Sequence, residues 1–176
     1  MIRIGTWRNN EFTGWGRETW ESGEIYEGKF INGKINGKGI YKNDSILYIG
    51  NFKDSIRDGK GEIYNNDYHY VGNFINDNFD GKGRIDIYNE GTYEGNFEDG
   101  KMNGYGVFKK INGEFYEGEI KNGIMDGYGK LFNENGIIYE GNFKNGKYDG
   151  KGILVNKEGN KFKGKFIKGI PSPRYN

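Results

Sequence analysis

The sequence has no cysteine and no alanine, and it has only two prolines, three leucines and one histidine among 176 residues. Without cysteine, the chain forms neither disulfides nor cysteine-bound metal sites. The lack of alanine and leucine removes the best helix formers, and the apolar character comes from isoleucine, tyrosine and phenylalanine, which favour strands. The composition therefore favours an all-β fold and is compatible with a reducing, intracellular compartment.

An excess of one charge is also missing, because 26 Lys and Arg residues nearly balance 25 Asp and Glu residues. The charges are interspersed, unlike the clustered basic residues of nucleic-acid binders and polybasic membrane anchors. No apolar run reaches the ~18 residues of a membrane helix, and the N-terminal segment has no apolar core of a signal peptide. Since the chain begins with Met1, we expect it to be complete. We expect an intracellular protein that does not bind nucleic acid.

Glycine, by contrast, is abundant: there are 32 residues, against about 12 at average usage. It recurs in the element Tyr-x-Gly-x-Phe, which repeats every 22–23 residues, and in a Gly-x-Gly element that begins 11 residues after each start except the last. The copies start at Arg3, Tyr26, Tyr48, Tyr70, Tyr93, Tyr116, Tyr139 and Phe162. All length variation lies between Gly-x-Gly and the next start, so a particular turn is expected to set the register of the other connection.

Each copy has the pattern of two strands. The Tyr, Gly and Phe of the first element share one face, because strand side chains alternate with period two, and the positions between them are mostly polar. Asn-Gly and Asp-Gly pairs predict hairpin turns. These pairs are Asn32-Gly33, Asn36-Gly37, Asp58-Gly59, Asp80-Gly81, Asp99-Gly100, Asn103-Gly104, Asn112-Gly113 and Asn145-Gly146. Stacked hairpins would form one antiparallel sheet in which aromatic rings lie over glycines of neighbouring strands, leaving a concave, aromatic-lined groove.

The pattern Tyr-Glu-Gly-x-Phe followed by Gly-x-Gly resembles the MORN repeat (membrane occupation and recognition nexus) over residues 3–169. The copies depart from it where Arg3 and Phe162 replace Tyr and Ile120 replaces the aromatic residue. The resemblance implies an elongated, twisted rod made of a single antiparallel sheet of consecutive hairpins. Residues 1–170 would form about seven and a half repeats, with a half repeat from 162, and residues 171–176 a C-terminal tail.

The resemblance also implies a function. Family members often act as scaffolds in cytoskeletal, ciliary, cell-division or membrane-contact assemblies, and some carry a catalytic domain, for which this chain has no room. We therefore expect a non-catalytic, cytoplasmic or cytoskeleton-associated scaffold that binds a peptide or helix of a protein partner. The alternative is a peripheral membrane or phosphoinositide-binding module, supported by the family name and by a lysine-rich final third. Those lysines are Lys144, Lys147, Lys151, Lys157, Lys161, Lys163, Lys165 and Lys168.

The candidate partner-binding residues are the aromatic residues of the predicted groove together with two tryptophans of the first copy. They are Tyr26, Tyr48, Tyr70, Tyr93, Tyr116, Tyr139, Trp15 and Trp20. Trp15 lies between two glycines and by parity points to the other face, and the alternative for both tryptophans is an aromatic cap over the first hairpin. Arg3 and Glu18, which stand where other copies are apolar, fit the same cap. Partners could also join at the sheet edges, and the half repeat at residues 162–169 is the expected edge for a homodimer.

No catalytic, cofactor or metal site is predicted. His69 is the only histidine, which is too few for an ordinary zinc site without cysteine, and we expect it to be an exposed or edge side chain. The Gly-x-Gly elements lie inside predicted strands and do not precede a helix, unlike phosphate-binding loops. The repeated glutamates are expected to form a solvated face rather than a metal site. They are Glu27, Glu94, Glu117 and Glu140.

Overall fold

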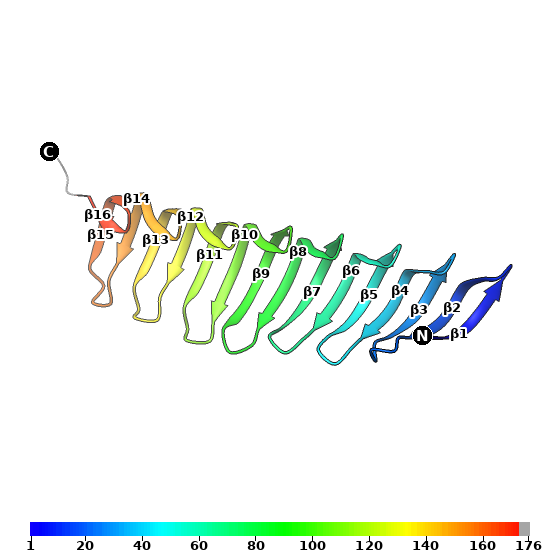
Figure 1. Ribbon diagram of the computed structural model, residues 1–176. Coiled ribbons are helices and arrows are strands. Elements are labelled where there is room, and N and C mark those ends of the chain that lie inside the picture. Colours follow the sequence, from blue (N-terminus) through cyan, green and yellow to red (C-terminus); the bar gives the residue numbers. More distant parts are fainter. Residues whose placement is uncertain (173–176) are drawn as a thin grey trace. The chain divides into compact units, whose positions relative to one another are not determined.

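The computed structural model describes residues 1–172, and every regular element in this part of the chain is a β-strand (Figure 1). The chain divides into two compact units, Met1–Tyr88 and Asn89–Asn176. The first unit contains β1 (Ile2–Arg8), β2 (Glu11–Thr19), β3 (Ile25–Ile31), β4 (Lys34–Lys42), β5 (Leu47–Lys53), β6 (Ile56–Tyr64), β7 (Tyr68–Ile75) and β8 (Asn78–Ile87). The second contains β9 (Gly91–Glu98), β10 (Lys101–Lys110), β11 (Phe115–Lys121), β12 (Ile124–Phe132), β13 (Ile138–Lys144), β14 (Lys147–Val155), β15 (Lys161–Ile167) and β16 (Ile170–Pro171).

Within each unit, every strand pairs antiparallel with its neighbours in the sequence, which confirms the predicted all-β fold of consecutive hairpins. The register places glycine opposite glycine, as in Gly28 with Gly39 and Gly50 with Gly61. The Tyr-x-Gly-x-Phe and Gly-x-Gly elements therefore meet at the middle of the strands. No helix in the described part of the chain is long and apolar enough to cross a membrane.

The fixed connection of each copy is a two-residue turn in which both residues have positive φ. Between β3 and β4 these are Asn32 at 49° and Gly33 at 74°. Such turns match the right-handed twist of the flanking strands, and Asn, Asp and Gly adopt positive φ most readily. Even Asp54-Ser55, which has no glycine, keeps this conformation, with φ of 49° and 72°. The prediction that one kind of turn sets the register is thus confirmed.

Four of the predicted turns are instead irregularities inside strands. Asn36-Gly37 lies within β4, where the pairing with β3 shifts between Gly28 and Phe30, and Gly37 has a φ of 68°. A bulge of this kind needs a residue with positive φ as much as a turn does, so the same dipeptide serves both. The other three are Asp58-Gly59, Asp80-Gly81 and Asn103-Gly104.

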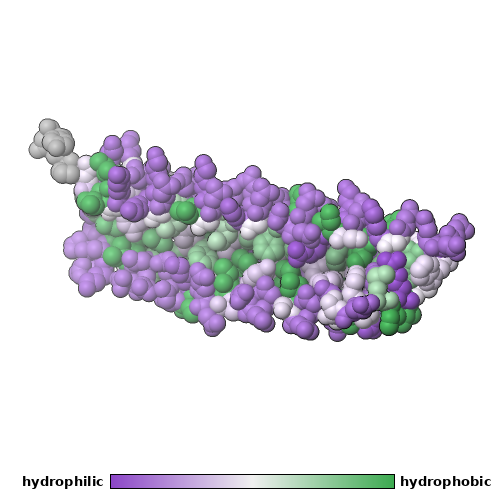
Figure 2. All heavy atoms as spheres, viewed as in Figure 1, coloured by the Kyte–Doolittle hydropathy of each residue, from purple (hydrophilic) through white to green (hydrophobic). Residues whose placement is uncertain are grey.

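The core of each unit is a layer of aromatic rings lying on one face of the sheet, over the glycines, as the sequence predicted. The Tyr48 ring covers Gly61 so closely that a Cβ atom there would lie 2.6 Å from Tyr48 Cε2. Phe52 and Phe74 pack edge-on against this ring, with centroids 5.0 and 5.1 Å away. Figure 2 shows hydrophobic residues gathered along the middle of the strands and hydrophilic residues at the hairpin ends. A single sheet thus acquires a second layer from its own side chains.

The tyrosine hydroxyls of this layer are also satisfied. The Tyr48 hydroxyl donates to the Asn51 carbonyl at 2.9 Å, and Tyr93 and Tyr139 make the same contact three residues further along their own strands. Every buried phenol therefore keeps a hydrogen bond, which removes the cost of placing it in an apolar layer.

Alkaline titration should reveal this layer. Burial raises the pKa of Tyr26, Tyr48 and Tyr93 from the ordinary 10.0 to about 12. Because the folded state holds these protons more tightly than the unfolded chain, their stabilisation is complete below about pH 10 and is lost as the pH rises toward about 12. We expect tyrosinate absorbance and the loss of circular dichroism to rise together in that window. Full ionisation of all tyrosines near pH 10 with unchanged dichroism would contradict it.

The first residue of the predicted C-terminal tail, Pro171, still belongs to the sheet. Pro171 belongs to β16 and pairs with Phe166, and Ile170 pairs with Ile167. Proline is tolerated here because the last strand of a sheet needs fewer backbone donors. Residues 173–176 of the predicted tail lie outside the described residues.

Candidate binding surfaces

The six repeat tyrosines are core residues, with only 0–3 % of each exposed. They lie flat over the glycines and contact phenylalanines of the same layer, as Tyr26 does with Phe30 and Phe52. The prediction that these rings line an accessible groove is therefore corrected, because a partner cannot reach them without opening the core. The corrected residues are Tyr26, Tyr48, Tyr70, Tyr93, Tyr116 and Tyr139.

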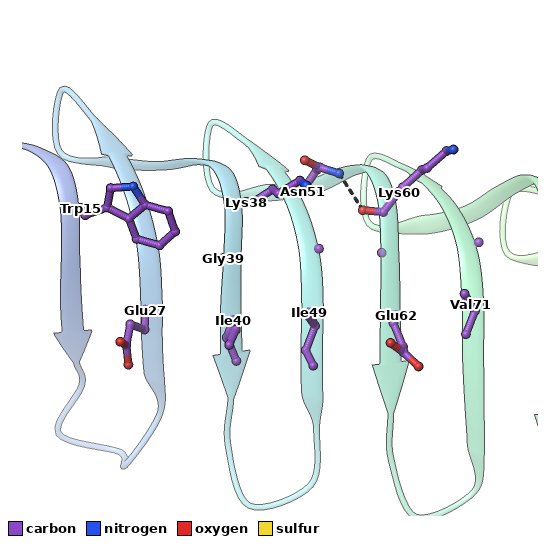
Figure 3. Close-up of a pocket in the computed structure, with 13 residues that line it drawn as sticks. Trp15, Glu27, Lys38, Gly39, Ile40, Ile49, Asn51, Lys60, Glu62 and Val71 are labelled. Carbon is purple, nitrogen blue, oxygen red and sulfur yellow. Dashed lines mark hydrogen bonds between the residues drawn. The ribbon is translucent and has the colours of Figure 1, made fainter.

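The opposite face of the first unit carries a groove of about 650 Å³ (Figure 3). Its floor is the backbone of the glycine row across β4 to β7. One wall is made by Trp15, Lys38, Asn51 and Lys60, and the other by Glu27, Ile40, Ile49, Glu62 and Val71. The two walls follow from strand alternation, since the residues on either side of each glycine point to the same face. We call this feature the glycine-row groove.

The glycine-row groove combines exposed apolar groups with free lysines. Ile40, Ile49 and Val71 are 41–44 % exposed, and Trp15 at one end is 66 % exposed. Ile40 and Ile49 are direct cross-strand partners, so their side chains form one continuous patch.

A side-chain hydrogen bond links two residues of the lysine wall of the groove. The Asn51 side-chain amide donates to the Lys60 carbonyl at 2.8 Å, which ties the wall to the bulge. Among the ion pairs of residues 1–172, none involves Lys38 or Lys60. Their ammonium groups therefore remain available to an acidic ligand.

The sequence carried a signal for this groove. In Tyr48-Ile49-Gly50 and Tyr70-Val71-Gly72 the residue before the glycine is aliphatic, whereas the clearest copies have glutamate there. Parity places that position on the face away from the tyrosines. Aliphatic residues at a position that is charged in five of the eight copies indicate exposed apolar surface, and such surface marks interaction sites.

A second groove, of about 700 Å³, extends from Met1 to Asp77 in the first unit. Its lining combines three aromatic residues with charged side chains; the aromatic residues are Trp20, Tyr41 and Phe52, and the charged ones Arg3, Glu18, Arg57 and Asp77. Trp20 packs edge-on against Tyr41, with centroids 6.4 Å apart. A groove that is partly aromatic thus exists on the tyrosine face, although the repeat tyrosines do not line it. Trp20 and Trp15 line separate grooves, so the two predicted tryptophans do not form one surface. Whether either binds a partner stays a prediction.

Arg3 and Glu18 form the end cap of the first hairpin. They face each other in the β1–β2 register, and Arg3 Nη2 lies 3.1 Å from Glu18 Oε1. Glu18 is only 3 % exposed, and the Arg3 guanidinium also lies over the Phe12 ring at 5.3 Å. The pair fills the space that apolar side chains fill in other copies.

The second unit has its own groove, of about 560 Å³, on the face that carries its glycine row. Three lysines line it: Lys151, Lys163 and Lys165. Lys151 and Lys165 are direct cross-strand partners. On the same groove, the Tyr128 hydroxyl donates to Glu140 Oε1 at 2.9 Å. This groove is therefore more basic than the glycine-row groove of the first unit.

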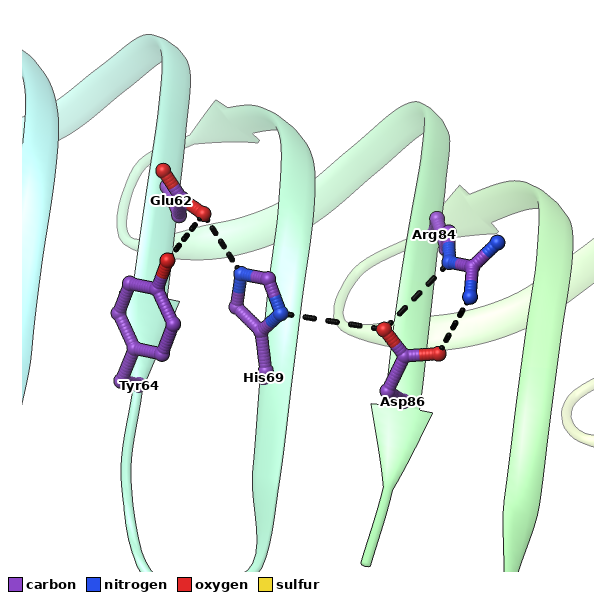
Figure 4. Close-up of polar contacts among 5 residues, drawn as sticks. All are labelled: Glu62, Tyr64, His69, Arg84 and Asp86. Atoms are coloured by element: carbon purple, nitrogen blue, oxygen red, sulfur yellow. Dashed lines mark hydrogen bonds and ion pairs between the residues drawn. The ribbon is translucent and has the colours of Figure 1, made fainter.

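His69 lies inside the sheet, on β7 between β6 and β8, and is neither an edge residue nor fully exposed. Its ring stacks on Tyr64 at 4.1 Å, and its Nε2 lies 2.7 Å from Glu62 Oε1 (Figure 4). Asp86 approaches the other ring nitrogen at 3.8 Å and also pairs with Arg84 at 2.9 Å. The expectation of an exposed or edge histidine is thus corrected, because its neighbours fix it within a polar cluster.

This polar cluster shares Glu62 with one wall of the glycine-row groove. Two hydrogen bonds lower the pKa of the Glu62 carboxyl: the one from Tyr64 has the larger effect and the one from His69 the smaller. The hydrogen bond to Glu62 in turn raises the pKa of the Tyr64 phenol. Glu62 therefore stays ionised next to the apolar patch. Within residues 1–172, no group of three or more His, Asp or Glu side chains is placed to hold a metal ion.

The C-terminal edge differs from its predicted form. β16 covers the end of β15 from Phe166 onward, and the Ser172 amide donates to the Lys165 carbonyl at 2.7 Å. Among residues 1–172, β1 and the part of β15 before Lys165 pair with another strand on one side only. The homodimer through the C-terminal edge stays a prediction, with a shorter stretch of backbone left for it.

Antiparallel hairpins that follow one another in the chain, each with a tyrosine over paired glycines, define a class of β-hairpin repeat proteins. The family model of the MORN repeat matches residues 4–25, 26–44, 48–68, 70–92, 93–115, 116–137 and 139–161. The chain belongs to the MORN-repeat family, as its sequence pattern predicted. MORN repeats belong to repeat proteins that are involved in protein or membrane interaction, and the family is not a known enzyme family. A comparison with curated proteins finds no match to the chain.

Proposed function

We propose that the protein is a non-catalytic scaffold that holds a protein partner in the glycine-row groove of its first unit. The observation that carries this proposal is the exposed patch of Ile40, Ile49 and Val71 beside the unpaired Lys38 and Lys60. On family grounds the partner belongs to a cytoskeletal, ciliary or other large cytoplasmic assembly. The proposal gives no residue a catalytic role.

The size of the patch is compatible with specific binding. Fully burying an aliphatic side chain contributes roughly 1.5–3 kcal/mol, and each of these three still exposes 41–44 % of its surface. Covering them therefore contributes on the order of 1 kcal/mol each, before any contribution from Trp15 or the lysines. Three such contacts change a dissociation constant by roughly a hundredfold, since every 1.4 kcal/mol is tenfold.

A capture experiment with matched variants tests the proposal. The test variant combines Ile40→Thr, Ile49→Thr and Val71→Thr, which keep strand propensity while removing apolar surface. The control combines Ile31→Thr and Ile75→Thr, which are 43 % and 50 % exposed but lie outside the groove. We expect the natural chain and the control to retain the same few proteins from the native cell. The test variant, folded by circular dichroism, should retain them at least about tenfold less.

The same experiment can overturn the proposal. If the test variant captures its proteins as well as the control does, the partner binds elsewhere. If both variants lose them equally, general surface hydrophobicity is responsible and the groove has no special role.

The alternative function, binding to a membrane or phosphoinositide, is favoured by one observation: three lysines converge on the groove of the second unit. Vesicles with and without phosphoinositide form a second arm of the experiment. Salt-sensitive sedimentation that is lost in the Lys151→Gln, Lys163→Gln and Lys165→Gln variant, with no protein retained, would replace the scaffold proposal by the membrane one.

A further inference from the structure

The width of the glycine-row groove limits the shape of its occupant. Its two walls stand two residues apart on each strand, as Lys60 and Glu62 do on β6, which corresponds to about 6.6–6.8 Å. An α-helix with its side chains is about 10–12 Å across, so it cannot reach the glycine floor between the walls. An extended chain can. Of the two ligand shapes considered above, a peptide or a helix, the groove therefore fits the peptide.

The spacing along the groove selects one extended conformation. Lys38 on β4 and Lys60 on β6 are two strands apart, which is about 9.6 Å at the usual strand separation. A polyproline II helix repeats every three residues and rises about 3.1 Å per residue, so side chains at i and i+3 are about 9.3 Å apart. A β-strand repeats every two residues, at about 6.6–6.8 Å, so its side-chain spacing does not match the separation of the two lysines.

The charges of the walls then orient the ligand. Lys38 and Lys60 stand on one wall without ion-pair partners. The other wall has two carboxylates among its apolar residues, those of Glu27 and Glu62. Acidic side chains are attracted to the first wall and repelled by the second, and such repulsion is a common source of specificity. The apolar side chains of the ligand are left to cover Ile40 and Ile49.

Building on the proposed function, we propose that the occupant is an acidic, polyproline II-like segment of a protein partner. Its Asp or Glu residues lie three apart and pair with Lys38 and Lys60, and an aliphatic residue or proline after each acid covers the patch of Ile40, Ile49 and Val71. The third residue of each turn faces solvent and is unrestricted. Trp15 borders the end of this path and offers a flat ring to a proline.

A labelled peptide with three repeats of Glu-Pro-Ile tests the inference by fluorescence anisotropy with the full chain. Two controls accompany it: a peptide of the same composition with its glutamates at alternate positions, and a Lys-Pro-Ile peptide. We expect the Glu-Pro-Ile peptide to bind at least about tenfold more tightly than either control. Its affinity should fall as salt is raised, because the two lysine contacts are partly exposed.

Variants of the protein locate the site. Lys38→Gln with Lys60→Gln should weaken binding at least about tenfold. The control, Lys42→Gln with Lys53→Gln, removes the same charge from lysines that do not line the groove and should leave binding within about twofold. Equal binding of the two glutamate peptides would overturn the three-residue repeat, and equal loss in both variants would reduce the effect to net charge.

The outcome is separable from that of the proposed function. If the aliphatic groove variant loses its native partner while the Glu-Pro-Ile peptide does not bind, the scaffold proposal stands and the acidic-segment inference fails. If the peptide binds in the expected manner but the native partner is unaffected by the groove variant, the groove is an acidic-peptide site that the captured proteins do not use.

Discussion

Replacement of Tyr48 by alanine is expected to lower the free energy of unfolding by about 3–5 kcal/mol, the usual cost of removing a large aromatic ring from a core. Tyr48 is fully buried and its ring contacts Phe52, Phe74 and the Arg57 guanidinium. Because the sheet has one layer of strands, few other side chains could move in to fill the space. Equilibrium unfolding in urea, followed by circular dichroism, measures the change.

Two control variants separate the ring from its hydroxyl. Tyr48→Phe keeps the ring and loses only the hydrogen bond to the Asn51 carbonyl, so it should cost about 0.5–1.5 kcal/mol. Tyr88→Ala removes a tyrosine that is 45 % exposed and should cost no more than about 0.5 kcal/mol. If Tyr48→Ala were no more costly than Tyr88→Ala, the aromatic layer would not be the core of this unit.

The tyrosines also show where sequence reasoning succeeded and where it could not. The alternation of Tyr48, Gly50 and Phe52 predicted their common face and the stacking of rings on glycines, because both depend only on period and side-chain size. Accessibility depends instead on how the ring tilts. Phe52 and Phe74 pack against the Tyr48 ring and close the layer around it, and no spacing pattern reveals how closely these rings pack. The predicted groove was therefore placed on residues that turn out to be buried.

The same alternation of strand side chains could have located the open groove. Ile49 and Val71 replace charged residues of other copies, and parity puts them on the face away from the core. The availability of Lys38 and Lys60, by contrast, depends on which carboxylates come near them in space. Likewise, Asn36-Gly37 predicts positive φ correctly but does not say whether the chain reverses or bulges there.

The two units also suggest how one repeat can serve two ligands. The same positions that hold Ile40 and Val71 in the first unit hold Ile153 and Lys163 in the second. The core positions stay the same because the tyrosine layer requires glycine beneath it, whereas the outward positions have no packing constraint. Such a sheet can change its ligand from copy to copy without changing its fold.

The second large effect is expected at the end cap, where Arg3→Met should lower the free energy of unfolding by about 3–5 kcal/mol. This change leaves the Glu18 carboxylate buried at 3 % exposure without its cation. The double variant Arg3→Met with Glu18→Leu should recover most of the loss, since apolar pairs of similar volume commonly replace buried ion pairs at little cost. Other copies already have apolar residues at the position of Glu18, among them Ile63.

A double-mutant cycle with Glu18→Leu alone gives the coupling between the two residues, and unfolding in urea supplies the four free energies. Arg8→Met, at an exposed residue of the same strand, is the matched control and should change stability by less than about 0.5 kcal/mol. If the double variant were as unstable as Arg3→Met, the loss would come from the arginine's contact with the Phe12 ring, and the carboxylate would not be its cause. Recovery in the double variant would mean that the cap is an apolar repeat position occupied by an ion pair, and that the first hairpin follows the same packing rule as the others.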